Sequence, residues 1–549
     1  MNSMRSYRSV SAAAFAVVIC ALVGVLYGRN TLSAQDASGR TSVPDQLRVF
    51  TAALAAVENG YVGTVESDRL VYSAISGMLQ TLDPHSNFMD PKSYAQMRER
   101  QEGRYYGLGI TIAAVDGDLT VVSIFEGSPA YQRGMRRGDV IARITGQDTK
   151  GWTSDQAVRI LRGAKGTPVQ ISIRRANFTN LIDLEVIRDE IHIPTVSAAF
   201  MIDGTTGYVR LSEFGENTDA ELGRALKDLT KDGMKRLVFD LRNNPGGALD
   251  QAIRVSNRFL PRGDMVVYTR GRVNNSDSDY RATEPSDYLT LPMVTLVNRS
   301  SASASEIVSG ALQDHDRSLI VGETTFGKAL VQSVYRVSEG AGVAVTTAHY
   351  YTPSGRLIQR PWDEGFDDYL TYTLREQDPN KAHNATDLKY TDAGRKVYSG
   401  GGIEPDRRFD GPIEGFSPTL LGRTLNNRQL FDTYAQRFSR KGDTRITVQS
   451  GAPRELAPDF EVTDAMVAEF KDFVVKARVK MDEAAWQKDL PFIRAMIRYE
   501  IDLDLFGVAA ARKHLVQRDP QMQFALGVFP EAEQLLNLGK TVGVRAAVR

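Results

Sequence analysis

The sequence contains almost no cysteine and no excess of either charge. Its 549 residues include one cysteine, Cys20, and equal numbers of basic and acidic side chains, 67 of each. A single cysteine excludes disulfides, thiolate metal sites and a cysteine nucleophile from the body of the chain. Zero formal net charge argues against a bulk nucleic-acid binder, which usually carries a basic excess. The length is too great for one hydrophobic core, so about three or four domains are expected.

One long uncharged run lies near the N-terminus. Arg5 and Arg8 precede the stretch 9–28, which has an apolar centre. A basic segment followed by an apolar one predicts export. Residues 1–34 are therefore expected to be either a cleaved signal peptide or an uncleaved membrane anchor. Basic residues before the run place the body outside the cytoplasm, in the periplasm or another extracytoplasmic space, with or without an anchor in the inner membrane.

The next segment, residues 44–102, is predicted to be helical. Leu47, Phe50, Leu54 and Val57 recur at helical spacing, and a second apolar pattern follows before Pro84. Such spacing is typical of amphipathic helices. We expect two short helices here, followed by a loop.

Residues 103–190 change to the pattern of a small β-rich module. Apolar and polar residues alternate on both sides of Asp116-Gly117, which is a hairpin signal. Thr153 stands three residues before Gln156, a capping box that opens a short helix. Several short strands and one short helix are therefore expected.

This module resembles a PDZ domain in the segments "YYGLGI" and "GSPAYQRGMRRGDVIARITG" and in the helix after Thr153. Gly107 and Gly109 allow backbone N–H groups to converge, and such a nest can hold the terminal carboxylate of a peptide. The adjacent strand can then pair with that peptide. The alternative is a structural β module without a ligand. The expected tail-binding residues are Tyr106, Gly107, Leu108, Gly109 and Ile110.

From residue 191 to 410 strand and helix patterns alternate, which indicates βαβ units in an α/β domain. Residues 425–549 are charged, with apolar side chains three to four positions apart, and are predicted to form a helical domain. We expect that domain to serve packing or dimerisation, because it contains no site chemistry.

Four serines crowd the segment "NRSSASASEIVSGALQD" between a predicted strand and a predicted helix. Ser303 and Glu306 form the S-x-x-E pattern of a capping box, which explains them without catalysis. A serine at a helix mouth can also be a nucleophile, because backbone N–H groups there stabilise an oxyanion. The expected donors are the N–H of Ala304 and one N–H from Gly246 or Gly247, which follow another buried strand.

A serine nucleophile needs a base. His315 is about 18 Å away along the same helix, and His349, at the end of a predicted strand, is held in reserve. Lys328 is the better candidate, provided that burial lowers its pKa. An apolar pocket from Phe326, Leu330 and Val331 would do so. Gln332 would orient the amine if the chain is helical there.

Residues 45–410 resemble the C-terminal processing peptidases, a family of Ser/Lys peptidases. In that family the middle serine of SASAS is the nucleophile, and the lysine of FGK, 25 residues further on, is the base. The resemblance implies these roles for Ser303 and Lys328, with Gln332 orienting the lysine. The matching motifs, in order, are "LDPHSNFM", the PDZ segment, "FDLRNNPGG", "VNRSSASASEIVSGALQD", "VGETTFGKALVQ" and "YYTPSGRLIQRP".

The resemblance also implies a multidomain α/β and β fold. The core would be related to the ClpP/crotonase type and would carry a PDZ domain, with helical regions at both ends. The oxyanion hole would use Gly246 or Gly247 and Ala304. The PDZ domain would bind substrate C-termini and control access to the site. The chain departs from the family at Ala329, where glycine is common, and beyond about residue 425, where the sequence does not follow the family's pattern.

The expected function is a serine endopeptidase that cleaves exported proteins with accessible apolar C-termini, without a metal or other cofactor. Its expected partners are those substrates, the membrane through the N-terminal segment, and a second copy or an adaptor protein, but no nucleic acid. Two alternatives stay open. One is a hydrolase with His349 as base, and the other is a non-enzymatic PDZ adaptor.

Overall fold

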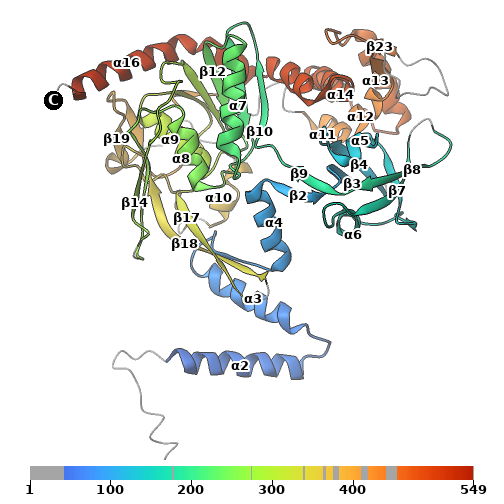
Figure 1. Cartoon of the computed structure of the whole chain (residues 1–549), viewed down its shortest axis with the longest axis horizontal. Coiled ribbons are helices and arrows are strands. Elements are labelled where there is room, and N and C mark those ends of the chain that lie inside the picture. Colours follow the sequence, from blue (N-terminus) through green and yellow to red (C-terminus); the bar gives the residue numbers. More distant parts are fainter. Residues whose placement is uncertain are drawn as a thin grey trace, which may run out of the picture. The chain divides into compact units, whose positions relative to one another are not determined.

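The computed structural model describes residues 42–547 (Figure 1), apart from residues 116, 176–177, 274, 338–339, 363–365, 375–382, 410–417 and 441–453. The expected signal peptide or anchor at 1–34 lies outside the described residues. Within them, no helix combines the length and the apolar character that crossing a membrane requires.

Residues 1–83 are a compact unit of their own, and the described part of it is a pair of helices. These are α2 (Val43–Gly60) and α3 (Ser67–Gln80), so the two predicted helices are confirmed. The apolar face predicted on α2 is not buried. Leu47 and Phe50 on this face are 59% and 43% exposed, and α2 contains no buried residue.

The second unit starts at Pro84, and its first helix is α4 (Pro91–Glu102). The β-rich module follows as one antiparallel sheet of order β3-β4-β5-β7-β8, with β6 beside β5. Two more strands, β2 and β9, pair with each other as a separate ribbon. The strands are β2 (Arg104–Gly107), β3 (Ile110–Val115), β4 (Asp118–Ile124), β5 (Val140–Ile144), β6 (Gln147–Asp148), β7 (Pro168–Arg174), β8 (Ile182–Ile187) and β9 (Asp189–His192).

Two short helices accompany this sheet, α5 (Pro129–Gln132) and α6 (Ser154–Leu161). The predicted capping box at α6 is confirmed. Thr153 Oγ1 accepts a hydrogen bond from the Gln156 N–H at 3.3 Å, and the Gln156 side chain accepts one from the Thr153 N–H at 2.8 Å.

The α/β pattern after residue 191 builds a six-stranded sheet of order β10-β11-β12-β15-β16-β21. Only β10 is antiparallel to its neighbour, and the other pairs are parallel. Parallel strands place their carboxyl ends at one edge, so the turns after β12 and β15 lie side by side. The strands are β10 (Val196–Met201), β11 (Thr206–Leu211), β12 (Arg236–Asp240), β15 (Met293–Val297), β16 (Leu319–Gly322) and β21 (Arg407–Arg408).

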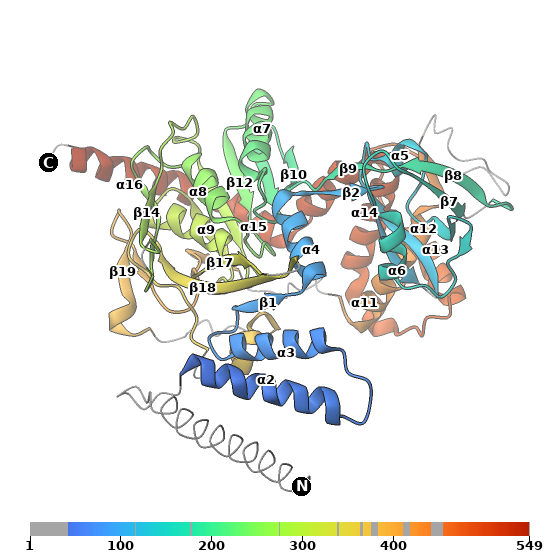
Figure 2. The ribbon, with the colours of Figure 1, turned by 60° about the horizontal axis from the view of Figure 1, so that its bottom comes forward.

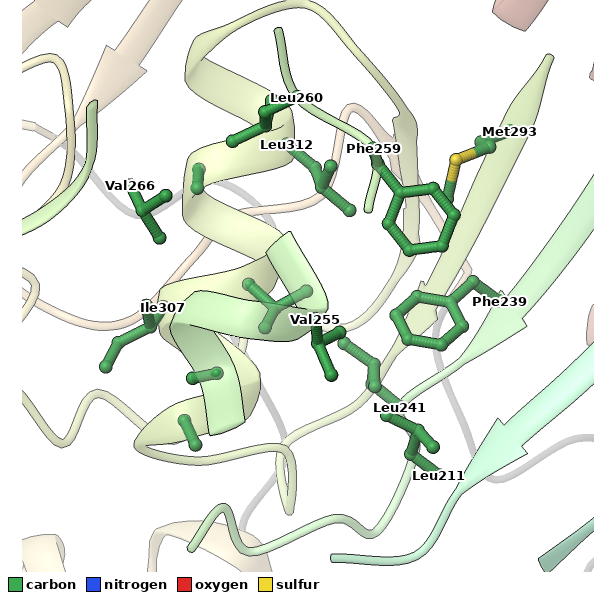
Figure 3. Packing of buried hydrophobic residues seen from close by; sticks show 14 of the residues in the cluster. Leu211, Phe239, Leu241, Val255, Phe259, Leu260, Val266, Met293, Ile307 and Leu312 are labelled. Atoms are coloured by element: carbon green, nitrogen blue, oxygen red, sulfur yellow. The ribbon is translucent and has the colours of Figure 1, made fainter. Parts of the chain in front are cut away.

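Side chains of this sheet alternate between two faces. On one face Val209 and Phe239 join a core with α7, α8 and α9, and Figure 3 shows Phe239 beside Phe259 in that core. On the other face Tyr208 and Val238 pack against α15 and α16. The C-terminal helices are thus a layer of the core. The helices are α7 (Thr218–Lys231), α8 (Leu249–Asn257), α9 (Ala304–Asp314), α15 (Pro520–Gly527) and α16 (Phe529–Ala547).

A second sheet has the order β1-β18-β13-β14, with β17 paired to β18. Its strands are β1 (Asn87–Met89), β13 (Met265–Arg270), β14 (Ser278–Arg281), β17 (Leu330–Arg336) and β18 (Gly342–Tyr351). Short elements follow it in sequence: α10 (Phe366–Leu370), η2 (Tyr372–Leu374), η3 (Ala385–Asp387), β19 (Leu388–Tyr390) and β20 (Lys396–Tyr398).

The C-terminal helices predicted from the sequence are present. Those between residues 421 and 506 share a separate hydrophobic core in which Phe431, Phe470 and Ile497 are fully buried. The last two helices, α15 and α16, pack on the core sheet instead. The elements of the separate core are α11 (Leu420–Asn427), α12 (Leu430–Ala435), β22 (Phe438–Arg440), β23 (Arg454–Leu456), α13 (Asp464–Lys476) and α14 (Glu483–Gln517).

Candidate active site

Ser303 lies at the mouth of α9, after β15, as the sequence predicts. Its backbone has φ 55° and ψ −114°, a conformation that costs a residue with a side chain about 1–3 kcal/mol. Such strain persists only where the surrounding structure imposes it, and it concentrates at functional sites. This backbone geometry favours a functional role for Ser303.

The neighbouring serines explain why the segment is rich in hydroxyl groups. Ser301 and Ser305 are fully buried. The Ser301 hydroxyl donates to the carbonyl of Leu241 at 2.8 Å, and the Ser305 hydroxyl donates to the carbonyl of Asn244 at 2.9 Å. Both bonds connect the N-terminal end of α9 to the turn after β12. These two serines are therefore structural, and Ser303 remains the candidate nucleophile.

Glu306 is fully buried and accepts four hydrogen bonds. Its Oε2 accepts the N–H groups of Ser303 at 2.8 Å and of Lys328 at 2.9 Å. Its Oε1 accepts the Gly327 N–H at 2.6 Å and the Thr325 hydroxyl at 2.5 Å. Burial raises the pKa of this carboxyl, and the four donors act in the opposite direction. The predicted bond between Glu306 and the Ser303 backbone is present, and the same oxygen brings Ser303 and Lys328 together.

Tyr350, on β18, makes a second connection that the sequence reasoning missed. Its hydroxyl lies 3.1 Å from the Ser303 carbonyl oxygen and 2.7 Å from the Lys328 carbonyl oxygen. Burial raises the pKa of this phenol well above its usual value, so it stays protonated and can donate to these carbonyls. The only signal for Tyr350 in the sequence is its position at the end of a strand with alternating apolar residues.

His349, the reserve candidate for the base, precedes Tyr350 on β18. Successive side chains on a strand point to opposite faces, so His349 points away from the face on which Tyr350 meets Ser303. Its Nδ1 atom is buried, and no other described residue offers it a hydrogen bond. This placement disfavours His349 as the base.

The Lys328 amine donates to Gln332 Oε1 at 3.2 Å, and Gln332 Nε2 donates to the His85 carbonyl at 2.5 Å. The bond was expected on the condition that the chain is helical between these two residues. That condition is not met, because Gln332 lies in β17, and the bond forms all the same. The strand carries a bulge between Val331 and Gln332, and the long side chain of Lys328 reaches Gln332 without helical spacing. The role of the His85 carbonyl has no signal in the sequence.

An aromatic cluster packs around the turn that carries Lys328. Phe326, predicted to line the lysine pocket, makes edge-on ring contacts with Tyr369 at 5.2 Å and Tyr372 at 6.0 Å. Leu330 is buried, and Val331 is partly buried. The sequence reasoning did not identify either tyrosine. In the described part of the chain, no group of three or more His, Cys, Asp or Glu side chains could hold a metal ion.

The glycine-rich turn after β12 lies directly against Ser303. A Cβ atom on Gly246 would be 2.8 Å from both the Ala304 nitrogen and the Ser303 Cβ. The Gly246 N–H already donates to Asn244 Oδ1 at 2.9 Å. Among the described residues, the N–H groups of Gly247 and Ala304 have no acceptor. The geometry therefore favours Gly247 over Gly246 as the donor beside Ala304.

We expect Gly247→Ala to lower stability by more than about 2 kcal/mol and to reduce activity. Gly247 has φ 144°, and its Cβ atom would lie 2.1 Å from the Phe214 carbonyl oxygen. The turn must therefore move. The matched control is Gly204→Ala, where nothing lies within 4 Å of the new atom. Urea unfolding of both variants checks the prediction, and equal midpoints would contradict it.

In the PDZ-like module, β3 is the first strand of its sheet, so its outer edge pairs with no other described strand. Gly109, just before β3, has φ 76°, and a Cβ there would lie 2.2 Å from the Ser128 Cβ. The side chain of Leu108 is buried. Tyr106 and Gly107 lie in β2, which pairs with β9. The five predicted tail-binding residues thus lead into an open strand edge, although two of them belong to a different ribbon.

Comparisons with known proteins identify families and relatives of this chain. The model of peptidase family S41 matches residues 205–366, that of the PDZ domain matches 96–174, and that of the activating protease CtpB N-terminal domain matches 23–93. The chain is 40% identical over 318 residues to the carboxy-terminal-processing protease of Bartonella bacilliformis, covering 57% of this chain and 73% of that protein. It is 35% identical over 347 residues to the carboxy-terminal processing protease CtpA of Bacillus subtilis, covering 63% and 73%.

Among solved structures, the photosystem II D1 C-terminal processing protease is 29% identical, with a TM-score of 0.34 and coverage of 67% of this chain and 94% of that one. The two bacterial relatives each share at least 35% identity over 73% of their own length, and the S41 and PDZ models match in the predicted order. The chain belongs to peptidase family S41 and is a serine peptidase of the carboxy-terminal processing type with a PDZ domain.

Proposed function

We propose that Ser303 is the nucleophile and Lys328 the general base of this peptidase, and that the enzyme cleaves exported proteins after binding their C-terminal tails. The observation that carries the proposal is the pair of connections between the two residues. One carboxylate oxygen of Glu306 accepts both backbone N–H groups, and one Tyr350 hydroxyl contacts both backbone carbonyls.

The reaction proceeds through an acyl-enzyme. Neutral Lys328 takes the proton of the Ser303 hydroxyl, and the oxygen attacks the carbonyl carbon of the scissile peptide bond. The lysine then gives the proton to the leaving amine, and the C–N bond breaks. Water, deprotonated by the same lysine, hydrolyses the ester and restores Ser303.

Charge that develops on the carbonyl oxygen needs donors that are in place before the reaction. We assign the N–H groups of Gly247 and Ala304 to this role, because Gly246 already donates to Asn244. Gln332 orients the lysine amine through its bond at 3.2 Å, and it is itself held by the His85 carbonyl. None of these steps assigned to the chain's own residues calls for a cofactor.

The PDZ domain would receive the substrate's tail as an additional strand beside β3. The segment from Tyr106 to Ile110, which joins β2 to β3, would meet the terminal carboxylate. Helix α6, which contacts β3, would form the other wall for apolar side chains. This arrangement suits proteins whose C-termini are accessible and apolar.

The proposed organisation has five parts: 1–34 for export or anchoring, 44–102 as the N-terminal helical region, 103–190 as the PDZ domain, 191–410 as the peptidase core and 425–549 as the C-terminal helical region. The body would act in the periplasm or another extracytoplasmic space, and residues 1–34 would contact the inner membrane. The exposed apolar face of α2, with Leu47 and Phe50, would contact a second copy or an adaptor protein.

The test of the function uses one unfolded substrate protein with two endings, one of small apolar residues and one of charged residues. We expect the chain to cleave the apolar-tailed protein at least about 10-fold faster in kcat/KM, because only that tail fits the groove beside β3. Mass spectrometry of the products and initial rates provide the measurement. Equal rates for both endings would contradict tail recognition while leaving the Ser/Lys assignment intact.

A further inference from the structure

The long helix α14 connects the part of the chain around the PDZ domain with the catalytic core (Figures 1 and 2). Its first half belongs to the separate C-terminal core through Ile493 and Ile501. Its second half contacts the core sheet, where Arg512 Nη1 donates to the Ser197 carbonyl at 2.8 Å. Between the halves, Gly507 breaks the helix with φ 86° and ψ 172°. One helix with an internal break therefore spans both modules.

At the first half of α14, a PDZ arginine is held by two carboxylates. Arg137 precedes β5, and its Nη1 pairs with Glu500 of α14. Its Nε lies 3.3 Å from Asp432 Oδ1 of α12 and donates to the Val122 carbonyl of β4 at 2.9 Å. The carboxylates of Asp432 and Glu500 are almost completely buried. We call Arg137, Asp432 and Glu500 the latch.

The break in α14 also meets the PDZ domain. A Cβ atom on Gly507 would lie 2.8 Å from Glu126 Oε1. Glu126 follows β4, the strand whose Val122 carbonyl binds Arg137. Strand β4 pairs with β3, for instance at Ile110 and Ile124. A peptide added to the open edge of β3 would therefore lie one strand away from both contacts with α14.

After α14, residues at the start of α15 contact the residues that begin the two segments leading to Gly247 and Lys328. Arg242 donates to Asp519 Oδ2 at 2.6 Å and to Gln521 Oε1 at 3.0 Å. Arg242 begins the turn that leads to Gly247. A Cβ atom on Gly322 would lie 2.6 Å from Gln521 Nε2, and Gly322 begins the segment that leads to Lys328.

The contact region between the modules is not tightly filled. A cavity of about 1010 Å³ is lined by PDZ, core and α14 residues, among them Phe125, Tyr208, Leu503 and Leu515. Among the described residues, Gln521 Nε2 is buried without a hydrogen-bond partner, and Asp432 Oδ1 has the ion pair with Arg137 but no hydrogen bond. Burial raises the pKa of Asp432 to about 6. Buried polar atoms without partners are rare and require an explanation, and a second arrangement of the modules would supply one.

We propose that the C-terminal helices couple the PDZ domain to the turns that carry Gly247 and Lys328. Tail binding beside β3 changes the ion pairs of the latch. Helix α14 transmits this change through Asp519 and Gln521 to Arg242 and Gly322. The coupling rests on the proposed tail recognition. It gives the C-terminal region, for which the sequence predicted only packing or dimerisation, a part in control of the active site.

The test compares the full chain with Arg137→Gln, with Asp432→Asn as a second latch variant, and with Arg133→Gln as a matched control. Arg133 is an exposed arginine of the same domain. The reporter is a short peptide with an amidated C-terminus, and the added probe is a short peptide that ends in three alanines. We expect the probe to stimulate reporter cleavage by the wild type and by Arg133→Gln. In both latch variants the stimulation should fall at least about 5-fold, the lower end of usual coupling.

Hydrogen exchange of residues 241–247 and 322–328 is measured on the same four proteins without probe. Altered exchange there in the two latch variants, with wild-type exchange in the control, supports the coupling. Stimulation and exchange that match the control overturn it. If the probe does not stimulate the wild type, tail recognition itself fails, and the exchange data alone decide the coupling. Since Asp432→Asn preserves side-chain volume, a folding defect in Arg137→Gln does not remove the test.

Discussion

Ser303→Ala should abolish peptide-bond cleavage, lowering kcat by at least about 10⁴-fold, as expected for loss of a nucleophile that acts together with its base. The substitution removes one oxygen atom and leaves the backbone connections of Ser303 to Glu306 and Tyr350 available. The chain should therefore fold, and binding of an apolar tail peptide should stay at the wild-type affinity. Single-turnover assays with the apolar-tailed substrate measure the loss.

Ser300→Ala is the control for this experiment, because Ser300 lies in the same turn. Within the described part of the chain, its hydrogen bond is the one from its backbone N–H to Asn298 Oδ1. We expect nearly full activity from it. Ser301→Ala would be a poor control, since the buried Ser301 hydroxyl holds the turn after β12. If Ser303→Ala cleaves at the wild-type rate, Ser303 is a cap residue and the nucleophile is another serine.

The placement of Ser303 could be predicted because local rules determine it. A buried β-strand followed by an S-x-x-E pattern puts the serine at a helix mouth, and parallel strands bring the turns after β12 and β15 to one edge. The capping bond and the approach of Gly246 to Ser303 followed from these rules.

The connections that complete the site could not be predicted in the same way, because they join segments that are far apart in the sequence. The Tyr350 hydroxyl and the His85 carbonyl enter the site through pairing of β17 and β18 and of β1 and β18. The contact of Gln332 with Lys328 was expected only if the chain is helical there, yet Gln332 lies on a bulged strand. A lysine side chain is long enough to reach a residue four positions away on either a helix or a strand. The four-residue spacing therefore does not distinguish the two.

The C-terminal region illustrates the same limit. Helical periodicity predicted α13 and α14 correctly, but it does not say which apolar face meets which partner. Val516 of α14 and Phe529 of α16 pack against the core sheet, whereas Phe470 belongs to the separate helical core. The break at Gly507 lies where α14 passes between the two environments, and a glycine within a helical pattern is ambiguous from sequence alone.

Lys328→Arg should reduce kcat by about 10²–10⁴-fold, the usual contribution of a general base. Arginine keeps the positive charge and a long side chain, but it cannot lose its proton in a protein, so it cannot accept the proton of Ser303. The Gln332 amide can still accept a hydrogen bond from the guanidinium. The substitution therefore removes proton transfer while it keeps a long side chain that can bond to Gln332.

The pH profile makes this test sharper. In the wild type, protonated Lys328 is inactive, so kcat/KM should rise with pH as the lysine loses its proton and then level off. Lys328→Arg should show a low rate without that rise. Lys227→Arg, on the exposed side of α7, is the matched control and should keep both the rate and the profile. Full activity in Lys328→Arg would exclude Lys328 as the base and return attention to His349, whose replacement by alanine should otherwise leave the chemical step unaffected.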